Sequence, residues 1–173
     1  MLKIKKIKIK KKLADKIEKL LTSDYFGWYY NHTTALKDED IEPDTFQFTH
    51  KFYDDIYNTA SYYYQNVLEL FHAANIKYER FSRIKSNFLV PSIKGIKHNH
   101  IHADQKKNGV KSFLYYVNDS DGDTIFFDNN KKEIKRFTPK KGTGLLFDSN
   151  ILHAGSNPVK YDKRIVINFI FYE

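Results

Sequence analysis

The chain of 173 residues contains no cysteine, so disulfide bonds and zinc sites built from thiolates are excluded. No apolar run approaches the length needed to cross a bilayer, and the lysine-rich N-terminus lacks the apolar segment of a signal peptide. Together these absences predict a cytoplasmic protein that has no membrane partner.

Acidic residues are absent from residues 1–12, which carry seven lysines. These lysines account for all but one unit of the net charge of +8, so the rest of the chain is close to neutral. A basic arm can bind nucleic acid or an anionic membrane surface. No aromatic residue or arginine interleaves the lysines, which favours a solvated terminus or an edge strand kept soluble by lysine. We therefore expect residues 1–12 to form a basic N-terminal arm.

The length suits one domain, which we expect to span residues 13–173. Apolar residues at helical spacing over 12–22 and 51–74 predict a helical layer within residues 13–75. Residues 36–45 are acidic, contain a proline and are predicted to form an exposed loop. Short strands separated by turn residues are predicted for a β core within 79–173, at 79–90, 95–104, 111–118, 123–128, 132–138, 143–148 and 164–173. This order predicts an α+β fold with a sandwich or jelly roll.

Three of the seven histidines and one aspartate alternate within residues 97–105, KHNHIHADQ. Alternate residues of a strand face the same side, so His98, His100, His102 and Asp104 would share one face. Such a face suits either a metal site or a solvent-exposed strand. This segment alone does not decide between them.

Two later residues favour the metal site. His153 follows the predicted strand 143–148 in an exit loop, and Arg164 opens the last strand, where an inward-pointing arginine needs an anionic partner. His-x-Asp with a distant histidine is the ligand set of non-haem Fe(II) oxygenases. Only His102 has a carboxylate two residues later, so the predicted ligands are His102, Asp104 and His153. Arg164 is then a clamp for a carboxylate.

The segments HIHAD, ILHAG and KRIVINF, with YYVN, DGDTIFF and PKKGTGLLFD, resemble the 2-oxoglutarate- and Fe(II)-dependent oxygenases. The similarity is to the prolyl 4-hydroxylase-like branch and its small phage and bacterial members, and it covers about residues 80–173. It implies a double-stranded β-helix (jelly roll) with N-terminal supporting helices. It also implies Fe(II), 2-oxoglutarate and O2 as cofactors, and hydroxylation of a substrate coupled to decarboxylation of 2-oxoglutarate to succinate.

The same resemblance assigns further residues. Tyr116 is the counterpart of the tyrosine that, with the arginine matched by Arg164, binds the distal carboxylate of 2-oxoglutarate. Asn87, upstream of His-x-Asp, corresponds to a residue that can touch 2-oxoglutarate. The sequence separates neither a protein side chain such as proline from a small-molecule substrate, nor one oligomeric state from another.

Three alternatives stay open at this point. His98 and His100 with His153 partly match a cupin-like metal protein, which shares the jelly roll but gives Arg164 no role. A nucleic-acid dealkylase of the same superfamily usually carries a second arginine where this chain has Ile170, although the basic arm keeps nucleic acid open as a partner. The third alternative is a non-enzymatic jelly-roll binding module that has kept the pattern.

Overall fold

The computed structural model describes residues 3–34, 45–92 and 97–173. Within them lie two helices, α1 (Lys11–Leu21) and α2 (Tyr64–Ala73). The strands are β1 (Lys5–Lys8), β2 (Tyr29–Asn31), β3 (Gln47–Asp54), β4 (Thr59–Ala60), β5 (Arg80–Leu89), β6 (Val110–Tyr116), β7 (Thr124–Phe127), β8 (Glu133–Phe137), β9 (Thr143–Asp148), β10 (His153–Gly155) and β11 (Arg164–Tyr172). The predicted acidic loop 36–45 lies, apart from its last residue, outside the described residues.

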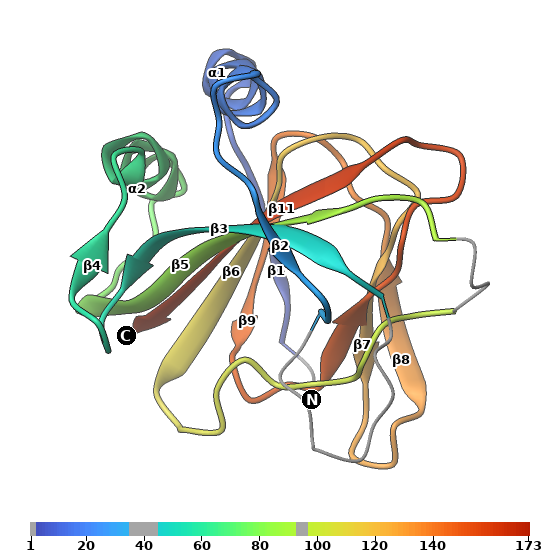
Figure 1. Ribbon diagram of the computed structural model, residues 1–173. Helices are drawn as coiled ribbons and strands as arrows, with labels where there is room; N and C mark the ends of the chain where they lie inside the picture. The colour runs from blue at the N-terminus through green and yellow to red at the C-terminus, as the bar shows by residue number, and fades with distance from the viewer. Residues whose placement is uncertain (1–2, 35–44, 93–96) are drawn as a thin grey trace.

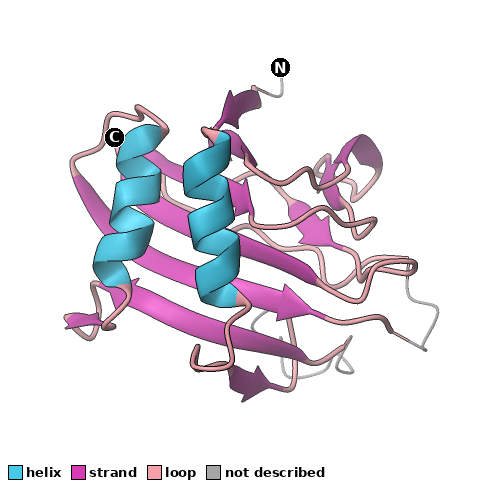
Figure 2. Ribbon diagram, turned by 90° about the horizontal axis from the view of Figure 1, so that it is seen from above, coloured by secondary structure: helices cyan, strands magenta, loops and turns pink. Residues whose placement is uncertain are grey.

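The strands form two antiparallel sheets. The larger runs in the order β1-β9-β6-β11-β5-β3-β2, with β4 beside β3, and the smaller runs β10-β7-β8. Figure 1 shows β7 and β8 on one side of the large sheet and both helices on the other. In Figure 2 the two helices lie side by side across the large sheet. This arrangement confirms the α+β jelly roll with supporting helices.

Alternation along β11 divides the core into two layers. Ile165, Ile167 and Phe169 pack with the apolar residues of the helices, whereas Val166 packs with residues of β6, β7, β8 and β9. Arg164 and Asn168 share the face of Val166, because alternate residues of a strand point the same way. The space between the sheets therefore receives the polar side chains of β11.

Helix α1 confirms the helix predicted over 12–22. Its buried residues Ala14, Ile17 and Leu21 recur every three or four positions and face the large sheet's core. Neither described helix has the length and apolar composition needed to span a membrane.

The helix predicted over 51–74 is wrong in its first part. Residues 47–54 form β3, and only Tyr64–Ala73 is helical. Phe48, His50 and Phe52 alternate with period two, and β3 pairs with β5 along its length. This pairing and the complete burial of Phe52 outweigh the helical spacing that begins farther along the chain.

The predicted strands at 79–90, 111–118, 123–128, 132–138, 143–148 and 164–173 are confirmed. The strand predicted over 95–104 is wrong, because in its described residues, 97–104, only His102 makes a β-bridge, to His153. His153 itself lies in the short strand β10, not in a loop. Residues 5–8 of the basic arm form an edge strand paired with β9.

Candidate functional site

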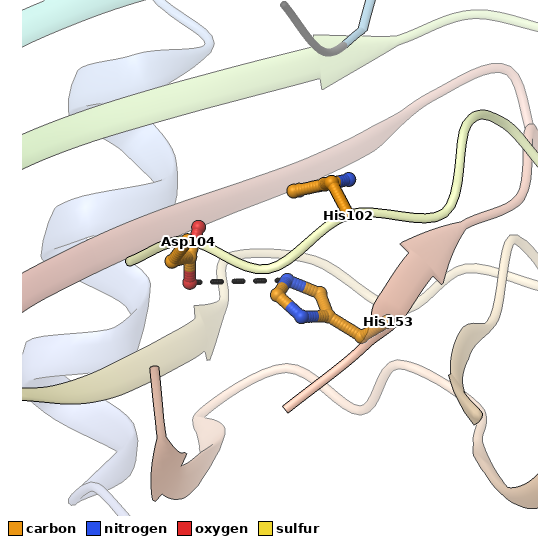
Figure 3. A group of neighbouring side chains, drawn as sticks. All are labelled: His102, Asp104 and His153. Carbon is orange, nitrogen blue, oxygen red and sulfur yellow. Dashed lines mark ion pairs between the residues drawn. The ribbon is translucent and has the colours of Figure 1, made fainter. Parts of the chain in front are cut away.

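Backbone pairing brings the first two predicted ligands together. His102 and His153 exchange both backbone hydrogen bonds, at 3.0 and 2.8 Å, although they are far apart in sequence. Their ring centroids lie 4.7 Å apart. Figure 3 shows Asp104 beside the two imidazoles, with His153 Nε2 3.8 Å from Asp104 Oδ2. The ligand atoms of the three residues all lie within 4.8 Å of one another.

Each imidazole is held by a backbone carbonyl. His102 Nδ1 lies 3.0 Å from the oxygen of His100, and His153 Nδ1 lies 2.9 Å from the oxygen of Ile151. A carbonyl oxygen only accepts, so both Nδ1 atoms carry the proton of the neutral rings and Nε2 is left as the lone-pair donor. A hydrogen bond of this kind also orients histidine ligands in metal sites.

The Asp104 carboxylate is held by two donors. Ser112 Oγ donates to Oδ2 at 2.6 Å, and Asn168 Nδ2 donates to Oδ1 at 2.8 Å. The guanidinium of Arg83 lies 3.9 Å from Oδ1. Burial alone would raise the pKa of Asp104, but His153, His102, Ser112 and Arg83 together lower it below its ordinary value. The carboxylate is therefore ionised at neutral pH.

Burial, and secondly the neighbouring His153, lower the pKa of His102 to about 4. The imidazole is therefore neutral at pH 7, which is the form that binds a metal ion. One carboxylate and two imidazoles whose Nδ1 atoms are held by backbone carbonyls fit Fe(II) as a ligand set.

The observed cluster contains only two of the four residues that alternate in the histidine-rich segment, His102 and Asp104. Among the described residues, His102, Asp104 and His153 are the group that could hold a metal ion, and His98 and His100 are not part of it. The ring of His98 packs against Phe127, with centroids 5.0 Å apart. The cupin-like alternative needs His98 and His100 as ligands, so the geometry disfavours it.

Arg164 lies buried in a close-fitting cradle. Its Nε donates to the carbonyl oxygen of Gly122 at 2.6 Å, and its Nη2 donates to Thr124 Oγ1 at 2.8 Å. A Cβ atom at Gly122 would lie 2.8 Å from Arg164 Cδ, and one at Gly155 would lie 3.2 Å from Nη1. Glycine at both positions thus allows the backbone to approach the guanidinium.

No carboxylate lies within ion-pair distance of Arg164 among the residues that the structure describes. Burial lowers its pKa, and Tyr116 and Asp123 oppose this effect, yet arginine stays charged in proteins. A buried guanidinium without an acid is costly unless a ligand supplies the anion. This arrangement fits one carboxylate of 2-oxoglutarate.

Tyr116 lies beside this guanidinium. Its hydroxyl donates to Thr124 Oγ1 at 2.9 Å, the same oxygen that Arg164 contacts. Burial raises the pKa of Tyr116 to about 12, so the phenol keeps its proton and acts as a donor. The structure therefore brings Tyr116 and Arg164 together, as the resemblance implied.

Asn87 lies on the face of β5 that points between the sheets. It pairs with Val166 of β11 on one side and with Thr49 of β3 on the other. Its Oδ1 is buried and has no hydrogen-bond partner. A side-chain amide left in this state is a candidate ligand contact.

Sequence reasoning missed Ser112 and Thr124 as parts of the site. Both are buried hydroxyl residues within apolar strands, and each contacts a predicted site residue. Thr124 stands in the DGDTIFF segment that contributed to the resemblance, but no role followed from it. Ser112 has no sequence signal, because its contact with Asp104 depends on the path of residues 103–105.

Metal-free protein is expected to lose stability as the pH falls from about 6.5 to about 4. The unfolded His102 binds a proton near pH 6.5, whereas the folded residue does so only near 4, so acid favours unfolding. The full shift corresponds to about 3 kcal/mol. Urea unfolding at pH 7, 6, 5 and 4 should show this loss, and His102→Gln should show a smaller one. His72→Gln, on the exposed side of α2, should keep the wild-type slope; an equal slope in all three proteins contradicts the prediction.

The model of the 2OG-Fe(II) oxygenase superfamily matches residues 91–172, a segment that includes the His102, Asp104 and His153 cluster. Tyr116 and Arg164 lie in the same segment. No curated protein shows a significant match to the chain.

Solved structures share the fold at low identity. The viral collagen prolyl hydroxylase of Paramecium bursaria Chlorella virus-1, in complex with 2-oxoglutarate, is 18% identical with a TM-score of 0.54, over 98% of this chain and 96% of that one. A Trichoplax adhaerens prolyl hydroxylase with a hypoxia inducible factor peptide is 14% identical with a TM-score of 0.61, over 98% and 83%.

The α-ketoglutarate-dependent carbocyclase SnoK of nogalamycin biosynthesis is 7% identical with a TM-score of 0.64, over 99% of this chain and 80% of that one. At these identities the three structures show the shared fold alone. The matched segment, residues 91–172, contains all three residues of the candidate metal cluster. This segment matches the model of the 2OG-Fe(II) oxygenase superfamily, whose members use Fe(II), 2-oxoglutarate and O2.

Proposed function

We propose that the chain is a 2-oxoglutarate-dependent hydroxylase in which His102, Asp104 and His153 hold Fe(II). The observation that carries this proposal is the cluster itself, with its ligand atoms within 4.8 Å of one another. Both histidine Nδ1 atoms are engaged by backbone carbonyls, and the carboxylate is kept ionised. Two nitrogens and one carboxylate leave further positions on the metal for 2-oxoglutarate and O2.

The remaining residues hold the co-substrate. Arg164 and Tyr116 bind the distal carboxylate of 2-oxoglutarate, and Asn87 contacts the co-substrate by donating an N–H of its side-chain amide. When bound, Fe(II), 2-oxoglutarate and O2 supply the oxidation of a substrate C–H bond, with 2-oxoglutarate decarboxylated to succinate. The protein orients these groups and limits competing reactions.

The aromatic residues around His153 help to limit competing reactions. Its ring packs against Phe126 and Phe147, with centroids 5.9 and 5.2 Å away. This aromatic wall keeps bulk water from one side of the candidate metal centre and strengthens electrostatic interactions within it.

A protein side chain such as proline is the substrate that we propose. The support is the fold shared with prolyl hydroxylases, one of which was solved with a peptide. A panel of proline-containing peptides, tested for succinate formation and a mass gain of one oxygen, checks this finer assignment separately from the cofactor chemistry.

Anaerobic titration with Fe(II) and 2-oxoglutarate tests the function. The expected result is the visible charge-transfer band of 2-oxoglutarate chelated to Fe(II), followed by succinate formation once O2 is admitted. A cupin-like metal protein would bind metal without consuming 2-oxoglutarate. Absence of the band in well-folded protein would contradict the proposal.

A further inference from the structure

A pair of cations lies on the face of β5 that points between the two sheets, next to the candidate metal centre. The strand register places Lys85 directly beside Asn168 of β11. Asn168 Nδ2 donates to Asp104 Oδ1, and Arg83 Nη2 lies 3.9 Å from the same oxygen. Arg83 and Lys85 alternate along β5, so both side chains reach this side of the sheet.

Of these two cations, Arg83 has only the distant Asp104 as an acid in the described part of the chain, and Lys85 has no acid of its own there. Lys85 makes no ion pair or hydrogen bond among the described residues, and Arg83 Nε is buried without a hydrogen-bond partner. Lys51, the cross-strand neighbour of Lys85 on β3, is paired with Asp54 at 2.6 Å. A partly buried cation without an acid raises the free energy of the folded protein unless an anion binds to it.

Under the proposed function, the two nearby carboxylates, those of Asp104 and of 2-oxoglutarate, already have other partners. Asp104 coordinates the divalent metal, and the distal carboxylate of 2-oxoglutarate binds Arg164. Arg164 and Asn168 lie on the same strand, with Cα atoms about 13 Å apart at the usual rise per residue. The cation pair beside Asn168 therefore lies apart from the guanidinium of Arg164.

We propose that Arg83 and Lys85 bind an anionic group, a carboxylate or a phosphate, of the substrate to be oxidised. This inference rests on the proposed function and narrows its substrate to an acidic one. The guanidinium fork of Arg83 matches two oxygens of either group, and the ammonium of Lys85 adds further donors. Anchored there, the substrate has its neighbouring C–H bonds beside the metal ligand Asp104.

The test uses the protein loaded with Zn(II) and 2-oxoglutarate, because zinc has no redox chemistry and does not turn over. Acetate and methyl phosphate are titrated at constant ionic strength, with chloride as the reference, and binding is followed by the NMR signals of the Asn168 side-chain amide. We expect at least one of the two anions to bind more tightly than chloride. The tighter anion identifies the group as carboxylate or phosphate.

Lys85→Met should weaken that anion's binding by about tenfold or more, since hydrogen bonds to charged groups are the strong ones. Lys85→Arg keeps the charge and should keep most of the affinity. Lys51→Met is the matched control: it removes one charge from the same row, and we expect a change of less than about threefold because Lys51 has its own acid.

Three results would overturn the inference. Equal responses to acetate, methyl phosphate and chloride contradict an anion site. Unchanged binding in folded Lys85→Met contradicts the assigned residue. A tenfold loss of 2-oxoglutarate affinity in Lys85→Met shows that the pair holds the co-substrate instead. Failure of the proposed function is seen separately, as wild-type protein that gives no charge-transfer band with Fe(II) and 2-oxoglutarate.

Discussion

Replacement of His153 by alanine is expected to abolish Fe(II) binding and, with it, consumption of 2-oxoglutarate. His153 Nε2 faces Asp104 at 3.8 Å, and among the described residues no other side chain completes the cluster. Loss of a direct ligand should exceed the roughly 10- to 100-fold that partners of metal ligands contribute. The measurement is the iron retained after anaerobic loading and desalting, together with the charge-transfer band.

The matched control is His98→Ala, from the same histidine-rich segment as His102. The ring of His98 packs on Phe127 outside the cluster, so this variant should retain iron as the wild type does. His153 is buried, and His153→Gln keeps more of the side-chain volume in case alanine unfolds the protein. Iron retained by folded His153→Gln, or lost from folded His98→Ala, would argue against these ligands.

The parts of the fold that the sequence predicted are those whose pattern is local and strong. The last strand was predicted over residues 164–173, and its alternation places Arg164, Val166 and Asn168 on one face and the apolar residues that pack with the helices on the other. Helix α1 has its buried residues at one clear spacing. In both elements the sequence shows one periodicity, and the tertiary contacts agree with it.

Two of the errors in secondary structure arose where the pairing of distant segments overrode a local pattern. In residues 47–63, the period-two alternation of Phe48, His50 and Phe52 ended just before a helical spacing began, and the pairing of β3 with β5 decided the outcome. In residues 97–104, alternating histidines suggested a strand, but only His102 forms a bridge. The pairing of distant segments carries no signal in a single sequence.

The same reason explains which site residues could be predicted. The spacing of His102 and Asp104 is local, the chemistry of an Fe(II) ligand set led to His153 and Arg164, and the resemblance supplied Tyr116. The structure gathers these residues into two clusters. The hydroxyls that support them and the unpaired state of Lys85 depend on cross-strand register. One-residue differences in register move a side chain to the opposite face, so such contacts need the structure.

Arg164→Ala is expected to weaken 2-oxoglutarate binding by about 100-fold or more while leaving Fe(II) binding intact. The guanidinium is buried, donates to Gly122 and Thr124, and has no carboxylate partner among the described residues, so the co-substrate supplies the anion in the proposed complex. Truncation of one member of a buried charge pair typically costs 2–5 kcal/mol, or roughly 30-fold and upward. Anaerobic titration of the iron-loaded protein with 2-oxoglutarate, followed by the charge-transfer band, measures the change.

Arg164→Lys separates charge from geometry, because lysine keeps the charge but lacks the planar fork that matches a carboxylate. We expect its affinity for 2-oxoglutarate to lie between those of the wild type and Arg164→Ala. Arg80→Ala removes an exposed arginine that pairs with Asp55 and should leave the titration unchanged. Wild-type affinity in folded Arg164→Ala would exclude this arginine as the carboxylate site, and would leave the buried guanidinium without the anionic partner that its surroundings require.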